Sequence, residues 1–140
     1  MSASVCYESY DRRVCNLKGA CGKILHVDLS RGKFSVEVPE EAFYRKYMGG
    51  SAVGAYYALK MTEPGIDTFD PGNVLVFAAS VTTGTPISGS SRFNVTAKSP
   101  LTGGLGDSQG GGFWGTELKY AGFDAVVITG RATKPVALWI

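Results

Sequence analysis

The sequence predicts a single domain in which short strands and short helices are mixed. The chain has 140 residues, a length typical of one domain. Hydrophobic residues make up 44% of it, which is enough to bury a core and argues against wholesale disorder. Two patterns indicate the mixed secondary structure: apolar residues with period two, and apolar residues at helical spacing between proline and glycine signals.

The first predicted elements are two strands that form a hairpin. Residues 23–29 have the composition of a strand, and residues 30–33 form the turn. The second strand is marked by apolar residues that alternate with polar ones, namely Phe34, Val36 and Val38. His26, the only histidine, lies in the first strand, and no serine or cysteine nucleophile with an aspartate stands near it. We therefore expect His26 to be structural.

Two helices are predicted next. Pro39, Glu40 and Glu41 place a proline and two acids in the first turn of a helix that ends at Gly49 and Gly50. The second helix covers about residues 51–61, where apolar residues recur at helical spacing: Ala52, Ala55, Tyr56 and Leu59. We expect the tyrosines of this region to pack near the domain surface: Tyr44, Tyr47, Tyr56 and Tyr57.

The second half of the chain is predicted as strands, glycine-rich loops and one helix. Residues 74–79 form a short apolar run typical of a buried strand. In the strand Arg92–Lys98, one face carries Phe93, Val95 and Ala97, and the other carries Arg92, Asn94, Thr96 and Lys98. Residues 82–91 and 99–112 are predicted as loops. A helix at 113–121, with Phe113, Trp114 and Tyr120 in the core, and strands at 124–129 and 136–140 complete the series.

Composition excludes several classes of function. A net charge of +2 is too small to indicate a nucleic-acid partner. No stretch approaches the ~20 apolar residues of a membrane helix, and charged residues at 11–13 argue against a signal peptide, so we expect a cytoplasmic protein. The familiar nucleotide loops and paired catalytic carboxylates are also missing.

The three cysteines, Cys6, Cys15 and Cys21, all lie in the first 21 residues and form no C-x-x-C motif. We expect reduced thiols in an irregular leader over residues 1–21. The alternative is a metal or redox site completed by another chain. Because the sequence stops within the last predicted strand, we also expect a longer protein or a partner that covers that edge.

The best candidate for a binding site is the polar face of Arg92–Lys98 together with the glycine-rich segment that follows it. An arginine fork suits phosphate or carboxylate. Residues 107–115 offer free backbone N–H groups at the start of a helix, and glycine allows an anion to approach closely. The candidate contacts are Arg92, Asn94, Lys98, Gly110, Gly111 and Gly112. A solvated sheet face and tight turns are the alternatives.

Four stretches resemble, in order, the amino-terminal domain of the tungsten-dependent aldehyde:ferredoxin oxidoreductases: residues 22–32, 48–51, 92–103 and 111–125. The resemblance covers about residues 22–140. It implies an α+β fold, with sheets related by a pseudo-twofold and a few short helices, that forms the base for a tungsten or molybdenum bis-pterin (molybdopterin-type) cofactor. It also implies that Arg92, Gln109 and Gly111 contact the pterin. Members of the family often have a basic residue where this chain has Ser51, and an asparagine where it has Gln109.

The resemblance implies an oxidoreductase that converts aldehydes to carboxylic acids with water as the oxygen source. Electrons would pass through a [4Fe–4S] cluster to ferredoxin or another iron–sulfur carrier. The cluster ligands and the aldehyde pocket would lie in the remaining domains or subunits, so we expect residues 22–140 to be an incomplete domain and this chain alone to be inactive. Two other functions stay open: a non-catalytic module that binds a phosphate-bearing small molecule, and a structural subunit that docks on a redox complex through residues 136–140.

Overall fold

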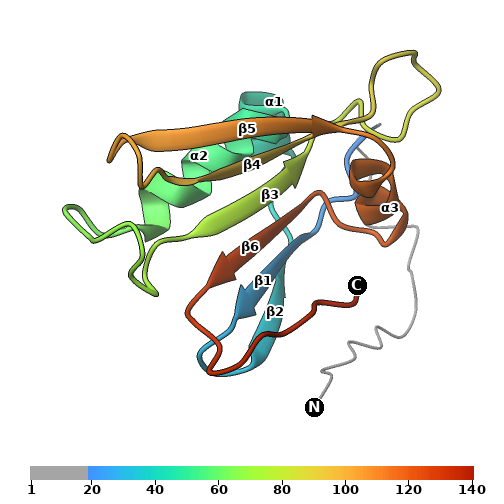
Figure 1. Ribbon diagram of the computed structural model, residues 1–140. Helices are drawn as coiled ribbons and strands as arrows, with labels where there is room; N and C mark the ends of the chain where they lie inside the picture. Colours follow the sequence, from blue (N-terminus) through green and yellow to red (C-terminus); the bar gives the residue numbers. More distant parts are fainter. Residues whose placement is uncertain (1–18) are drawn as a thin grey trace.

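The computed structural model describes residues 19–140, which form one six-stranded mixed sheet and three helices (Figure 1). The strands are β1 (Ile24–Asp28), β2 (Lys33–Glu37), β3 (Leu75–Ala79), β4 (Arg92–Lys98), β5 (Leu105–Gly111) and β6 (Ala125–Thr129). The helices are α1 (Glu41–Tyr47), α2 (Gly50–Met61) and α3 (Trp114–Tyr120). The α+β class predicted from the sequence is confirmed.

The strand order in the sheet is β2-β1-β6-β3-β4-β5. Strand β6 is inserted between the N-terminal hairpin and the β3–β4–β5 meander. It runs parallel to β1 and antiparallel to β3, while the other neighbours are antiparallel. Strands β2 and β5 are therefore the two edges of the sheet.

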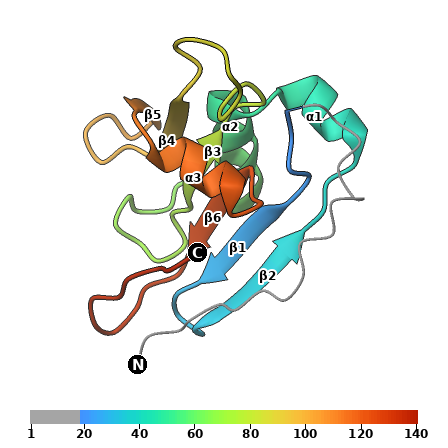
Figure 2. The same ribbon diagram turned by 90° about the vertical axis from the view of Figure 1, so that its right-hand side faces the viewer.

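Helices cover both faces of the sheet (Figures 1 and 2). On one face, Val53 and Tyr57 of α2 pack on the small and β-branched residues of the central strands: Ile24, Val76, Ala78, Ala125 and Val127. On the other face, Leu118 of α3 and Phe123 pack on Leu25, Val27 and Val126. Such apolar burial on both faces explains why the central strands carry almost continuous hydrophobic runs.

Helix α2 is confirmed, but it buries a different face from the one that its apolar spacing indicates. Val53, Gly54, Tyr57 and Ala58 are buried, whereas Ala52 and Leu59 are exposed. The reason is Gly54, because a Cβ at this position would lie 2.2 Å from the Thr96 hydroxyl of β4. The helix therefore approaches the sheet along its glycine side.

Three predictions for the second half of the chain are wrong. Residues 105–111 are not a loop but strand β5, which pairs with all of β4 from Arg92↔Gly111 to Lys98↔Leu105. Residues 136–140 do not form a strand. Phe113, Trp114 and Tyr120 are not core residues, since they are 84%, 41% and 70% exposed.

The start of the described chain is fastened to the turn between α3 and β6. The backbone N–H groups of Cys21 and Gly22 donate to the Asp124 carboxylate over 2.8 and 2.7 Å. Lys119 forms an ion pair with the same carboxylate, and its ammonium also donates to the Gly19 carbonyl over 2.7 Å. Cys6, Cys15 and most of the predicted leader lie outside the described residues. Within residues 19–140, no helix is long and apolar enough to cross a membrane.

Candidate cofactor-binding site

The β4–β5 hairpin decides which candidate residues can meet. Residues directly opposite each other in an antiparallel pair point to the same face of the sheet. Arg92 lies opposite Gly111, Asn94 opposite Gln109, and Thr96 opposite Asp107. These side chains therefore share the face against which α2 packs, while Phe93 and Gly110 share the other face.

A hydrogen-bonded polar cluster occupies the part of this face next to the start of α2. We call it the Asp107 cluster, and its members are Ser51, Asn94, Thr96 and Asp107. The Asn94 amide donates to the Ser51 hydroxyl over 2.6 Å and to the carboxylate over 3.2 Å. The hydroxyls of Ser51 and Thr96 donate to the carboxylate over 2.7 and 2.9 Å. Asn94 and Thr96 are only 7% and 0% exposed.

The structure does not bring Asn94 or Lys98 to a ligand-accessible surface beside Arg92. Asn94 is buried, and its amide is used within the Asp107 cluster. The Lys98 ammonium donates to the Ile66 carbonyl, and its backbone N–H donates to Asn73 Oδ1 over 3.1 Å. Lys98 is also at the opposite end of β4 from Arg92, about 20 Å along an extended strand. The polar face thus separates into a hydrogen-bonded cluster in which Asn94 and Thr96 are buried, an anchored lysine and an exposed arginine.

Arg92, Gln109, Gly111 and Gly112 do come together, at the end of the hairpin near α3. Arg92 and Gln109 are exposed, and within residues 19–140 neither side chain has a hydrogen bond or ion pair. A Cβ on Gly112, where φ is +100°, would meet nothing within 4 Å. A Cβ on Gly111 would meet only the Ser91 carbonyl oxygen, at 3.8 Å. This end of β5 therefore presents open backbone next to a guanidinium.

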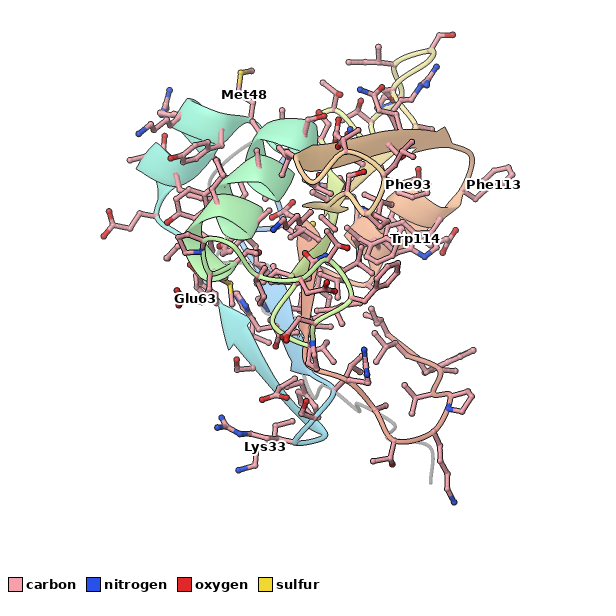
Figure 3. All side chains as sticks on the ribbon, turned by 60° about the vertical axis from the view of Figure 1, so that its left-hand side comes forward. Lys33, Met48, Glu63, Phe93, Phe113 and Trp114 are labelled. Carbon is pink, nitrogen blue, oxygen red and sulfur yellow. The ribbon has the colours of Figure 1, made fainter. Side chains whose placement is uncertain are left out.

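Gly110 has a different role, because it faces the opposite side of the sheet. A Cβ there would lie 2.8 Å from the Phe93 ring. The Phe93 ring also packs on Trp114, with ring centroids 4.7 Å apart. Figure 3 shows Phe93 and Trp114 close together and Phe113 pointing away from the body of the domain. The absence of a side chain at Gly110 thus leaves room for the Phe93 ring, which packs on Trp114 on the face of the hairpin opposite α2.

The predicted anion site at the start of α3 is weaker than the sequence indicates. Helix α3 has only seven residues, and no side chain caps its first turn. Its dipole is correspondingly small. The Gly112 carbonyl accepts a hydrogen bond from the Ser91 hydroxyl, which fixes the approach to the helix. The start of α3 therefore offers little to an anion, and the open backbone at Gly111 and Gly112 remains the candidate.

Sequence reasoning did not predict the hydrogen bonds that join Ser51 and Asp107 to Asn94 and Thr96. Asp107 is the single carboxylate between residues 73 and 116, and that isolation is the signal that could have identified it. Ser51 directly follows the paired glycines at 49 and 50. Within residues 19–140, no group of three or more histidine, cysteine, aspartate or glutamate side chains could hold a metal ion.

Residues 24–140 match the family described as aldehyde ferredoxin oxidoreductase, N-terminal domain. The chain belongs to this family. It is 43% identical over 122 residues to the tungsten-containing aldehyde ferredoxin oxidoreductase of Pyrococcus horikoshii, which covers 87% of this chain and 20% of the relative. It is 34% identical over 123 residues to the WOR-like subunit of an aliphatic sulfonate oxidoreductase of Pyrococcus furiosus, covering 85% of this chain and 19% of the relative.

A solved structure shares the fold as well as the sequence pattern. The active site complex BamBC of benzoyl coenzyme A reductase, solved with 1,5-dienoyl-CoA, superposes with a TM-score of 0.80 and 34% sequence identity. The match covers 84% of this chain and 18% of that chain. The family prediction from the four sequence motifs is therefore confirmed, and the chain spans about a fifth of the length of the relatives it matches.

Proposed function

We propose that this chain is the cofactor-cradling domain of a cytoplasmic family member that oxidises aldehydes to carboxylic acids. In this proposal the complete enzyme uses a tungsten or molybdenum bis-pterin and passes electrons through a [4Fe–4S] cluster to ferredoxin or another iron–sulfur carrier. The observation that carries it is the exposed Arg92 guanidinium beside the open backbone of Gly111 and Gly112, in a chain that matches the family over residues 24–140.

The residues at this end of the hairpin fit a phosphate-bearing pterin. The planar guanidinium of Arg92 can donate two parallel hydrogen bonds to a phosphate. The Gln109 amide offers a donor and an acceptor on the same face, which suits a ring with both kinds of group. Gly111 and Gly112 carry no side chain that would keep a planar ligand away from their N–H groups. The proposed contacts are Arg92, Gln109, Gly110, Gly111 and Gly112. The three glycines would contribute backbone groups only, and Gly110 also makes room for Phe93 on the other face.

The contribution of this domain to the reaction is electrostatic and positional. When bound, the cofactor would supply the two-electron chemistry that converts an aldehyde and water into a carboxylic acid. Arg92 would offset the phosphate charge, and the backbone of β5 would donate hydrogen bonds to the cofactor. Asn94 and Lys98 would act at a distance, since their side chains are engaged within the chain.

The comparison of relatives favours an aldehyde as the substrate. Identity is 43% to the aldehyde ferredoxin oxidoreductase, against 34% to both the sulfonate oxidoreductase subunit and the benzoyl coenzyme A reductase complex. The remaining domains or subunits of the enzyme would supply the substrate pocket and the cluster ligands. We accordingly expect the purified 140-residue chain alone to show no aldehyde oxidation with a dye acceptor.

Metal and phosphorus analysis tests the proposal. The chain, purified from its native host with whatever copurifies, should contain tungsten or molybdenum together with phosphorus and iron. Arg92→Ala should lower the metal and phosphorus content, whereas Arg31→Ala, at an exposed arginine in the turn after β1, should not. Equal metal and phosphorus in the two variants, or a preparation free of both, would contradict the proposal.

A docking role is the second candidate, favoured by the exposure of the apolar side chains near residue 140. Val136, Leu138, Trp139 and Ile140 are 58%, 44%, 80% and 42% exposed. If these residues bind an iron–sulfur subunit, a double substitution Leu138→Ser and Trp139→Ser should reduce the copurified iron and leave tungsten and phosphorus unchanged. Unchanged iron in this variant would argue against docking at this surface.

A further inference from the structure

We infer that Asp107 is a positioning residue, whose carboxylate holds the edge strand β5 against α2 and so fixes the backbone at Gln109 and Gly111. The inference deepens the proposed function and rests on it. Asp107 itself would touch no cofactor. It would act through the strand that carries the contacts.

Strand β5 has little of its own to hold it in place. Three of its seven residues are glycine, and its single large apolar side chain, Leu105, is 48% exposed. Glycine, aspartate and serine are poor strand formers because they add little packing to a pleated surface. As an edge strand, β5 has a neighbouring strand, β4, on one side only. Such a strand frays easily unless side chains attach it to the body of the domain.

Asp107 provides that attachment. Within residues 19–140, it is the only β5 residue whose side chain makes a hydrogen bond. Its partners lie on two other elements: Ser51 on α2, and Asn94 and Thr96 on β4. Both β4 partners are buried, whereas Asp107 itself is exposed, so the carboxylate accepts hydrogen bonds from two buried donors at the edge of the sheet. Loss of such an acceptor is costly, because it leaves a buried donor unsatisfied.

The glycines of α2 make this cluster possible. A Cβ on Gly50 would lie 3.0 Å from the Asn94 amide oxygen, and Gly54 sits directly over Thr96. The start of the helix is therefore close enough for the Ser51 hydroxyl to reach the carboxylate. The two carboxylate oxygens of Asp107 thus join α2, β4 and β5. The position of β5 is therefore set by the helix as well as by its pairing with β4.

The proposed contacts follow Asp107 on the same face of the strand. Gln109 is two residues further on and Gly111 four, with Arg92 across the ladder from Gly111. A carboxylate on this face repels an anion. If only charge mattered, its removal would strengthen the binding of a phosphate group. Positioning predicts the opposite, because a loosened strand no longer presents its N–H groups in one arrangement. The two roles therefore predict opposite changes in phosphate affinity when the carboxylate is removed.

Nuclear magnetic resonance on the 140-residue chain tests the inference, with wild type, Asp107→Asn and the control Ser108→Ala. Ser108 is the next residue on β5, exposed and on the other face. Asp107→Asn should speed amide hydrogen exchange over residues 108–112 by about tenfold or more, with β1, β3 and β6 unchanged. Titration with inorganic phosphate, followed at the Gly111 and Gly112 amides, should show affinity lowered by about threefold or more. Ser108→Ala should change neither quantity.

Two results would overturn the inference: tighter phosphate binding by Asp107→Asn, or exchange that accelerates equally in β3 and β6. Tighter phosphate binding would mean that the carboxylate acts only by repelling the anion. Equal acceleration in β3 and β6 would mean that it contributes to the stability of the whole domain and not to the position of β5. If Asp107→Asn does not fold, Ser51→Ala removes a partner of the carboxylate from the helix side, and the same criteria apply. If phosphate does not shift the Gly111 and Gly112 amide resonances of the wild-type chain, the proposed function is contradicted. The hydrogen-exchange data still decide whether Asp107 holds the strand.

Discussion

Replacement of Gly54 by alanine should destabilise the domain, although alanine is the better helix former. Gly54 lies in the middle of α2 and is buried against β4. A Cβ there would be 2.2 Å from the Thr96 hydroxyl oxygen and 2.8 Å from the Thr96 Cβ. To reach ordinary van der Waals separation, the helix would have to recede from the sheet by about 1 Å. Val53 and Tyr57, which pack in the same core, would recede with it.

The expected net loss is about 1–2 kcal/mol, which is the cost of overpacking less the gain in helix propensity. Overpacking of a dense core costs about 1–3 kcal/mol, and here it also strains the hydrogen bond from Thr96 to Asp107. Against this stands a gain of about 1 kcal/mol, because alanine has the higher helix propensity. The clash outweighs the propensity because the nearest atoms belong to a buried, β-branched residue with no room to move.

Urea unfolding followed by tryptophan fluorescence measures the change, with the slope of the transition as a check on two-state behaviour. Ala52→Gly, at an exposed position of the same helix, calibrates the propensity term and should cost about 1 kcal/mol. A Gly54→Ala protein that is about 1 kcal/mol more stable than wild type would refute the reasoning. It would mean that α2 does not lie as close to β4 as described.

Two further predictions concern buried ionisable groups. Asp124→Asn should lower the free energy of unfolding in urea by about 3–5 kcal/mol, because the Lys119 side chain, only 8% exposed, loses its ion-pair partner. The exposed pair of Glu41 and Arg45 is the control, and Glu41→Gln should cost less than about 1 kcal/mol. Burial raises the pKa of the Tyr57 phenol, and the charge of nearby Glu37 raises that pKa further. As the pH rises above about 10, Tyr57 ionises in the unfolded chain before it does in the folded one, so the stability of the wild type should fall. Tyr57→Phe should lack that part of the fall when the free energies of unfolding are compared at about pH 8 and pH 11.

The elements with a local signature were predictable from the sequence. Strand β4 has strict alternation, and its bounds match the prediction, Arg92–Lys98. Strand β5 has no such signature, since glycine and polar residues of low strand propensity fill it. It forms because β4 offers a complete ladder and because Asp107 finds partners on α2 and β4. Tertiary context here overrides local preference, and no short window of sequence contains that information.

The candidate site was predictable in part for a related reason. Alternation correctly assigns Arg92, Asn94, Thr96 and Lys98 to one face, but it cannot say what covers that face. Polar side chains there suggest solvent, whereas α2 covers Asn94 and Thr96 and leaves Arg92 exposed. Because Gly50 and Gly54 let the helix approach closely, the distinction depends on the packing of a helix some forty residues earlier in the chain.

The central place of β6 has a consequence for how the chain folds during synthesis. Strand β6 joins the β1–β2 hairpin to the β3–β4–β5 meander, and β1 pairs with residues about a hundred positions later. Until residues 125–129 have been made, the two halves of the sheet have no common strand, and their apolar faces stay open. Contacts of such long sequence separation form slowly. While residues 112–129 are being made, the nascent chain therefore holds two unjoined pieces that need protection from aggregation, and completion of one five-residue strand unites them.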